Sequence, residues 1–183
     1  MDELRNILLT GGAGYIGSHV ALALIDQGYK VTVLDNLITG TKKVIPKEAE
    51  FIECDIADVS TLNSILLNKK FDALMHFAAL IKVEESIEKP DEYIKNNAHK
   101  SSILFGVCIK HGLNSIIFSS TAAVYGNSSK FPIKENANLS PLNPYARSKV
   151  LTEKYLEKLS QDKKVNYIIL RYFNVAGADP SLR

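Results

Sequence analysis

Short apolar runs rich in β-branched residues alternate with longer stretches of helical spacing along this 183-residue chain. The runs are apolar on both faces, which is typical of strands buried in a parallel sheet. The expected strands are Asn6–Thr10, Val31–Asp35, Phe51–Asp55, Ala73–Phe77, Ser115–Ser119 and Tyr167–Arg171. The expected helices are Tyr15–Gln27, Asp58–Leu67, Asp91–His111 and Pro144–Ser160. This alternation predicts an α/β fold, a Rossmann-type doubly wound parallel sheet with helices on both faces.

Composition is that of a folded globular protein. The apolar fraction is 46% and the charged fraction 23%, whereas disorder needs fewer apolar residues and more net charge. The sequence has no internal repeat, low-complexity tract or linker, so we expect a single domain over residues 1–183. The one long loop expected is Asn127–Leu142, which is rich in serine, asparagine and proline. Long loops in compact domains often carry function.

Charge and cysteine content disfavour several kinds of partner. The formal net charge is only +2, so no nucleic-acid surface is expected. No apolar run approaches the length of a bilayer-spanning helix, so no membrane partner is expected either. Cys54 and Cys108 form no CxxC pair, and the histidines show no metal-ligand spacing. We therefore expect a cytoplasmic protein without a metal site or a disulfide framework.

The first expected strand runs directly into a glycine-rich turn, Gly11–Gly17, with the sequence GGAGYIG. Glycines let the backbone approach a dinucleotide pyrophosphate, and the following helix N-terminus offers free N–H groups. The second expected strand ends in Asp35, where a carboxylate can bind the ribose hydroxyls and repel a 2′-phosphate. The turn thus predicts a dinucleotide site that prefers NAD over NADP. The alternative is an ordinary strand–helix turn with Asp35 as a turn acid.

A tyrosine and a lysine lie four residues apart at the start of the last expected helix. Tyr145 and Lys149 therefore share one helix face, where the ammonium is expected to lower the pKa of the phenol. Thr121 follows the strand Ser115–Ser119, at the sheet edge where ligands of such folds bind. These three residues are candidates for general acid–base chemistry at a substrate oxygen. Taken singly, Tyr145 and Lys149 are better explained as exposed helix residues and Thr121 as a turn cap, and it is their occurrence with the glycine turn that favours the catalytic interpretation.

The motifs taken together are similar to the extended short-chain dehydrogenase/reductase family, also known as the NAD-dependent epimerase/dehydratase family. The resemblance runs from Asn6 to about Pro180. Its most specific motifs are TGGAGYIGSH (Thr10–His19), LDNL (Leu34–Leu37), HFAAL (His76–Leu80), SSTAAVYG (Ser119–Gly126), NPYARSK (Asn143–Lys149) and RYFNVAGADP (Arg171–Pro180). It implies a tightly held, recycled NAD and a UDP-sugar substrate. The implied reaction interconverts UDP-glucose and UDP-galactose through a 4-keto intermediate.

The resemblance also implies roles for individual residues. Tyr145 would be the acid–base at the sugar 4-hydroxyl, Lys149 would hold the nicotinamide ribose, and Thr121 would hydrogen-bond the 4-oxygen. Asn174 would contact the substrate together with Thr121 and Tyr145. The implied cofactor contacts are Gly11, Gly14, Tyr15, Ile16, Gly17, Asp35, Asn36, Asp55, Ile56, Phe77, Ala78, Ala79, Asn97, Tyr145, Lys149 and Phe173.

The chain departs from the family pattern at two points. Many members have a lysine where this chain has Ile81, which leaves that contact with the cofactor phosphates open. The family pattern also continues beyond the last motif into a substrate-binding portion. We therefore expect a cofactor-binding portion that binds NAD but is weakly active or inactive alone. The resemblance further implies a homodimer through helices 91–111 and 144–160.

Several other functions stay open. Another nucleotide-sugar epimerase or a decarboxylase of the same family would differ mainly in the portion beyond the last motif. A 4,6-dehydratase is disfavoured, because Ala122 and Ala123 stand where such enzymes usually carry an acidic pair. A non-catalytic NAD-binding module would have no need of Tyr145 and Lys149, and both are present.

Overall fold

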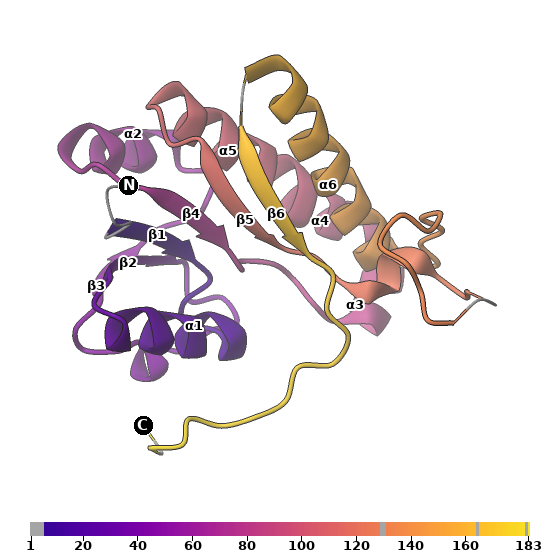
Figure 1. Cartoon of the computed structure of the whole chain (residues 1–183), viewed down its shortest axis with the longest axis horizontal. Helices are drawn as coiled ribbons and strands as arrows, with labels where there is room; N and C mark the ends of the chain where they lie inside the picture. Colours follow the sequence, from indigo (N-terminus) through magenta and orange to yellow (C-terminus); the bar gives the residue numbers. More distant parts are fainter. Residues whose placement is uncertain (1–5, 129–130, 164, 182) are drawn as a thin grey trace.

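The computed structural model of the chain describes residues 6–128, 131–163, 165–181 and 183. Six strands form one parallel sheet in the order β3-β2-β1-β4-β5-β6, with helices packed on its faces (Figure 1). This is the strand order of a doubly wound dinucleotide-binding sheet, so the predicted fold is confirmed. β1 pairs with β2 on one side and with β4 on the other. The chain thus reverses its winding direction at β1, and ligands bind in the crevice at such a point.

Every predicted strand and helix region is present, with shifts of one to three residues at several ends, the largest at the end of the last helix, which was predicted at Ser160 and lies at Lys163. The strands are β1 (Asn6–Thr10), β2 (Lys30–Asp35), β3 (Glu50–Glu53), β4 (Ala73–His76), β5 (Ser115–Ser119) and β6 (Asn166–Leu170). The α-helices are α1 (Tyr15–Asp26), α2 (Val59–Asn68), α3 (Val83–Glu88), α4 (Pro90–Tyr93), α5 (Lys100–Lys110) and α6 (Pro144–Lys163). The other helical segments are the 3₁₀ turns η1 (Lys42–Val44) and η3 (Ala122–Tyr125) and the π-helical η2 (Ile94–His99).

Alternate residues of the strands supply two separate cores. Leu8 of β1 packs into a cluster with α2, α5 and α6. Its neighbours Ile7 and Leu9 pack on the opposite face, into a cluster with residues of α1. Figure 1 shows α1 on the face of the sheet opposite to α2 and α5. Burial on both faces is the reason that the central strands are apolar without alternation.

The segment predicted as one helix, 91–111, is divided into three parts. α4 leads into the π-helical turn η2, and α5 follows without a break. Such π-helical turns are rare and occur often at functional sites. The turn places the buried Asn97 against α6. α3 was not predicted, because six residues are too few to show a helical period.

α6 begins as the sequence predicts. Pro144 is its first residue, and the side chain of Asn143 caps it by accepting a hydrogen bond from the Ala146 N–H at 2.8 Å. The long loop before it, Asn127–Leu142, includes residues 129–130, which lie outside the described residues. No helix in the described part of the chain is long and apolar enough to cross a membrane.

One row of apolar side chains crosses the α1 face of the sheet and becomes exposed at β6. The row follows the strand register through Leu9, Met75, Ile117 and Ile168. Leu9 is fully buried, Met75 and Ile117 are half-buried, and Ile168 is 56% exposed. α1 therefore covers this face at β1 and leaves it open at β6. After β6 the chain runs back toward α1 as an extended tail (Figure 1).

Candidate cofactor and catalytic site

The glycine turn lies at the carboxyl end of β1 and contains two kinds of glycine. Gly11 has a φ of +76°, and a Cβ there would lie 2.4 Å from the Ala78 nitrogen. A Cβ on Gly17 would lie 2.1 Å from the Gly11 oxygen. Gly14 differs, since its Cβ would meet only the Gly11 oxygen, at 3.4 Å. The fold itself therefore requires Gly11 and Gly17, whereas Gly14 faces open space.

The N-terminus of α1, beside Gly14, has the properties of an anion site. Gly14 is its N-cap residue, and no side chain within the described residues caps the helix. The first N–H groups of a helix have no intrahelical acceptor and carry a partial positive charge. Open space and free donors at this point fit the pyrophosphate of a dinucleotide such as NAD.

Asp35 joins the glycine turn to the end of β2. Its Oδ2 accepts a hydrogen bond from the Ala13 N–H at 3.0 Å, and its Oδ1 accepts one from the Leu37 N–H at 2.9 Å. The carboxylate is half-buried at the carboxyl end of β2, the position predicted for a ribose-binding acid.

Asp55 lies next to this acid, after β3. Its Oδ2 accepts a hydrogen bond from Asn36 at 3.3 Å and pairs with Lys100 at 2.5 Å. Burial raises the pKa of Asp55, but the hydrogen bonds, above all that from Lys100, outweigh this and hold the pKa below its usual value. The side chain of the neighbouring Ile56 is buried in the core with α2 and α5. The structure thus brings Asn36 and Asp55 together and turns the Ile56 side chain inward.

The segment after β4 forms the other wall of the turn. Phe77 donates its N–H to the Thr10 oxygen at 3.0 Å, and the backbone of Ala78 lies against Gly11. Asn97 holds the continuation of this segment, because its amide bonds both the N–H and the oxygen of Leu80 at 2.8 Å. Asn97 was predicted to contact the cofactor, and its amide groups are engaged within the protein.

Tyr145 and Lys149 lie one helical turn apart on α6, close to the end of β5. Lys149 is 2% exposed, and its Nζ donates to the Ser119 oxygen at 2.8 Å. The same nitrogen lies 5.0 Å from the centroid of the Phe118 ring and 5.9 Å from that of Tyr145. Thr121 follows β5, and its hydroxyl accepts a hydrogen bond from the Ala123 N–H, capping η3. The three predicted catalytic residues therefore meet at the carboxyl end of β5.

Burial controls the protonation of this pair. Burial raises the pKa of Tyr145 above its usual value, and a hydrogen bond with Thr121 opposes the rise. Burial lowers the pKa of Lys149 to about 7, while the charge of Glu153 opposes the fall. The expected lowering of the Tyr145 pKa is thus absent in the chain alone. The lysine ammonium gives its hydrogen bond to Ser119 rather than to the phenol.

Phe173 and Asn174 lie on the tail after β6, where both side chains are exposed. Tyr15 joins the tail to the start of α1, since its hydroxyl donates to the Gly177 oxygen at 2.7 Å. Arg183 anchors the tail further along through an ion pair with Asp26 at 2.7 Å. The predicted substrate contact Asn174 is therefore exposed on the tail, whereas Lys149 is buried.

The sequence analysis missed an ion pair beneath this site. Glu153 lies on α6 one turn after Lys149 and pairs with Arg171, the first residue after β6, at 2.6 Å. The available signal was an acid four residues after Lys149, on the buried stripe of the helix.

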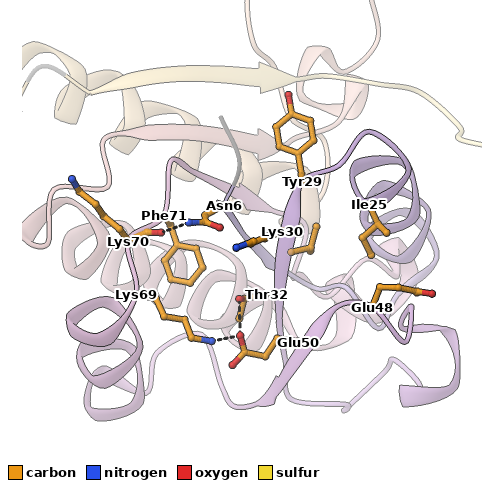
Figure 2. Close-up of a pocket in the computed structure, with 11 residues that line it drawn as sticks. Asn6, Ile25, Tyr29, Lys30, Thr32, Glu48, Glu50, Lys69, Lys70 and Phe71 are labelled. Carbon is orange, nitrogen blue, oxygen red and sulfur yellow. Dashed lines mark hydrogen bonds and ion pairs between the residues drawn. The ribbon is translucent and has the colours of Figure 1, made fainter. Parts of the chain in front are cut away.

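A separate hollow of about 440 Å³ lies at the opposite edge of the sheet (Figure 2). It is lined by residues such as Lys30, Phe71 and Glu50, at the amino ends of the strands. Lys69 pairs with Glu50, and Thr32 donates to the same carboxylate at 3.1 Å. These contacts lower the pKa of Glu50, chiefly through Lys69. The hollow is remote from the carboxyl ends of the strands, where the predicted residues gather.

Residues 7–182 match the profile of the NAD dependent epimerase/dehydratase family. The chain belongs to this family. The predicted family resemblance is therefore confirmed, and NAD, the cofactor predicted from the glycine turn, is the cofactor of the family.

Individual relatives share much of the chain. The UDP-glucose 4-epimerase of Azospirillum brasilense is 45% identical over 177 residues, which cover 97% of this chain and 51% of the relative. UDP-arabinose 4-epimerase 1 of Arabidopsis thaliana is 38% identical, and the match covers 98% of this chain and 45% of that relative. The structure of UDP-glucose 4-epimerase from Brucella ovis in complex with NAD has a TM-score of 0.93 at 40% identity, covering 96% of this chain and 54% of that one. This family member thus spans about half the length of the curated relatives it matches.

Proposed function

We propose that this chain is the cofactor-binding portion of a UDP-sugar 4-epimerase that interconverts UDP-glucose and UDP-galactose. The observation that carries the proposal is the meeting of Tyr145, Lys149 and Thr121 at the end of β5. All strands of the sheet are parallel, so this cluster lies on the same edge as the glycine turn. The relatives, a UDP-glucose 4-epimerase and a UDP-arabinose 4-epimerase, supply the UDP-sugar class and the 4-position of the reaction.

The residues divide the reaction between them. NAD supplies a hydride acceptor that returns the hydride in the second half of the reaction. Tyr145 takes the proton of the sugar 4-hydroxyl as the hydride leaves C4, which produces a 4-keto sugar. Thr121 hydrogen-bonds the 4-oxygen, while Lys149 holds the nicotinamide ribose and balances the charge on the phenolate. The keto sugar turns over in the site, and Tyr145 gives the proton back to the 4-oxygen.

The substrate needs more protein than this chain offers. Binding energy from the uridine and diphosphate holds the reacting carbon in place. Asn174 is the proposed substrate contact outside the Tyr145 cluster, and it lies exposed on the tail. We assign the remaining contacts to the half of the relatives' length that lies beyond this match. The same portion would cover the open face at Ile168.

We further propose a homodimer through helices 91–111 and 144–160. α5 and α6 expose the apolar side chains of Ile103 and Leu151, which supports an interface on these helices. Light scattering on the chain and on a variant with Ile103→Glu and Leu151→Glu tests this. A dimer that the double substitution turns into monomer supports the interface, and a monomeric parent contradicts it.

A second candidate is a UDP-arabinose 4-epimerase, which the relatives of that name favour. The two functions require the same chemistry at C4 and differ in the sugar at C5. Assays of UDP-galactose and UDP-arabinose side by side, with an active form that contains this chain, distinguish them by the ratio of kcat/KM values.

Substitution of the phenol tests the mechanism. In an active form that contains these residues, Tyr145→Phe should lower kcat by about 10²–10⁴-fold, because it removes the acid–base hydroxyl and keeps the ring. NAD affinity should change little in that variant. Lys149→Met should weaken both turnover and NAD binding, because the lysine has both roles. Near-normal turnover of the Tyr145→Phe enzyme would remove Tyr145 from the mechanism.

A further inference from the structure

Glu153 is a fully buried carboxylate within one helical turn of the proposed catalytic lysine. Its side chain is 0% exposed, so it depends entirely on protein partners. Ser120 donates its hydroxyl to one carboxylate oxygen. Arg171 donates to both oxygens, through Nε at 3.1 Å and through Nη2 at 2.6 Å. The carboxylate is thus held by the two residues that directly follow β5 and β6.

Arg171 extends this contact to two further segments. Its Nη1 donates to the Tyr125 hydroxyl at 2.9 Å and to the Glu135 oxygen at 2.8 Å. Tyr125 ends η3, and Glu135 belongs to the long loop that precedes α6. One arginine therefore joins the ends of β5 and β6, the turn η3, the loop and α6.

These segments carry the proposed catalytic and substrate residues. Thr121 lies between Ser120 and η3, Tyr145 and Lys149 lie on α6, and Asn174 follows Arg171 on the tail. A buried ion pair adds little stability compared with apolar residues of similar size. Stability alone therefore gives no reason for charges at this point, whereas the fixed geometry of an arginine fork does.

The charged and titratable groups around Lys149 come from its own helix, from β4 and from the segment after β6. Glu153 and Tyr145 lie on its own helix, and His76 of β4 is neutral because burial lowers its pKa to about 3. Arg171 and Tyr172 follow β6. Tyr172 is uncharged at neutral pH, since burial raises its pKa, and its hydroxyl bonds the Ser119 hydroxyl. Glu153 is thus the negative group that favours the ammonium form of Lys149, against the burial that lowers its pKa to about 7.

We propose that Glu153 is a positioning residue that acts through Lys149. Its carboxylate, fixed by Ser120 and Arg171, supplies the negative charge that keeps the lysine ammonium beside Tyr145. The same contacts hold Thr121 against α6. The importance of this for catalysis rests on the proposed function, whereas its effect on Lys149 is a property of the chain itself.

The titration of Lys149 tests this directly. The chain is labelled with ¹³C-lysine, and the Lys149 Cε resonance is identified by its absence in Lys149→Met. In the parent, the midpoint of the Lys149 titration is expected at about pH 7. In Glu153→Gln it should move toward acid by about one pH unit, because the opposite charge is gone. Glu157→Gln, an exposed position one turn further along α6, is the matched control and should leave the midpoint unchanged.

If Glu153 had a merely structural role, its substitution would shift the Lys149 midpoint in the opposite direction. Loosening of the site would admit water to Lys149 and move its midpoint toward the ordinary lysine value. An alkaline shift or no shift in folded Glu153→Gln therefore overturns the proposal. If Glu153→Gln does not fold, Glu153→Asp decides, because it keeps the charge and should keep the midpoint within about half a pH unit of the parent. A midpoint near 10.5 in that variant would contradict the proposal.

The pH dependence of NAD affinity separates this proposal from the proposed function. If Lys149 holds the nicotinamide ribose, NAD affinity should fall above the Lys149 midpoint, and Glu153→Gln should move that fall toward acid. A shifted lysine midpoint together with a pH-independent NAD affinity would retain Glu153 as a positioning residue and remove the assigned role of Lys149. Tight NAD binding together with a Lys149 midpoint that Glu153→Gln does not shift would retain the assigned role of Lys149 and remove Glu153 as a positioning residue.

Discussion

Gly14 separates cofactor binding from folding better than any other residue of the glycine turn. Its φ of −93° and ψ of 171° suit any residue, and its Cβ direction is open. Gly14→Val should therefore fold and lose NAD affinity by about 100-fold or more, because the branched side chain occupies the space of the pyrophosphate. Calorimetric titration with NAD measures this, together with circular dichroism as a check of folding.

Gly17→Ala is the matched control in the same turn. A Cβ there collides with the Gly11 oxygen, so this variant should lose about 1–3 kcal/mol of unfolding free energy by overpacking. Unchanged NAD affinity in folded Gly14→Val would show that the pyrophosphate does not bind at this turn.

Asp35 is the residue predicted to determine the choice between the two nicotinamide cofactors. Its charge should repel the 2′-phosphate of NADP, so the parent should bind NAD more tightly by roughly tenfold or more. Asp35→Asn removes the charge and keeps an acceptor for the backbone, whereas Asp35→Ser loses the bonds to Ala13 and Leu37. Both should reduce the preference, and only the serine variant should be clearly less stable. Tighter binding of NADP than NAD by the parent would contradict this role.

At the level of residues, spacing predicted neighbours but not the directions of polar groups. The four-residue interval placed Tyr145 and Lys149 on one face, and the structure agrees. It did not predict that the ammonium bonds the Ser119 oxygen, because that contact depends on how α6 packs on β5. The spacing of Glu153 from Lys149 indicated a buried acid, but no local signal indicated its partner Arg171, which lies 18 positions away on another element.

The π-helical turn η2 makes tertiary hydrogen bonds through Asn97. The Asn97 side chain donates hydrogen bonds to the Leu80 oxygen on one side and to the Ser148 hydroxyl of α6 on the other. Asn97→Ala would leave the half-buried backbone groups of Leu80 without their Asn97 partner, so it should cost about 2–3 kcal/mol of unfolding free energy. Asn96→Ala, next to it in the same turn, should cost less than about 1 kcal/mol. Urea denaturation measures both, and equal costs would show that Asn97 does not hold the turn.

Strands and long helices were predictable at this level, and short or irregular helices were not. Two-sided apolar runs identified all six strands, because the sheet buries both faces at its centre. The π-helical turn within 91–111 follows from bonds to other elements, and such bonds leave no trace in a local pattern. The start of α6 was predictable, since Asn143 and Pro144 are local signals.

The whole molecule presents the predicted motifs at the carboxyl ends of the strands and a sheet face that is open at β6. In the proposed function, the chain alone should epimerise UDP-galactose poorly or not at all, because the contacts for uridine and diphosphate are missing and the site is open to water. Mixing with a separately expressed C-terminal portion of a related epimerase should restore turnover. Turnover by the chain alone at the rate of a full-length relative would contradict this.

Titration of the chain with NAD by calorimetry tests the central claim most directly. The account predicts saturable binding of one NAD per chain, weaker binding of NADP, and loss of binding in folded Gly14→Val. A folded chain that binds no NAD, or that binds it unchanged when Gly14 is replaced by valine, would contradict the assignment of this chain as the cofactor-binding portion of a UDP-sugar 4-epimerase.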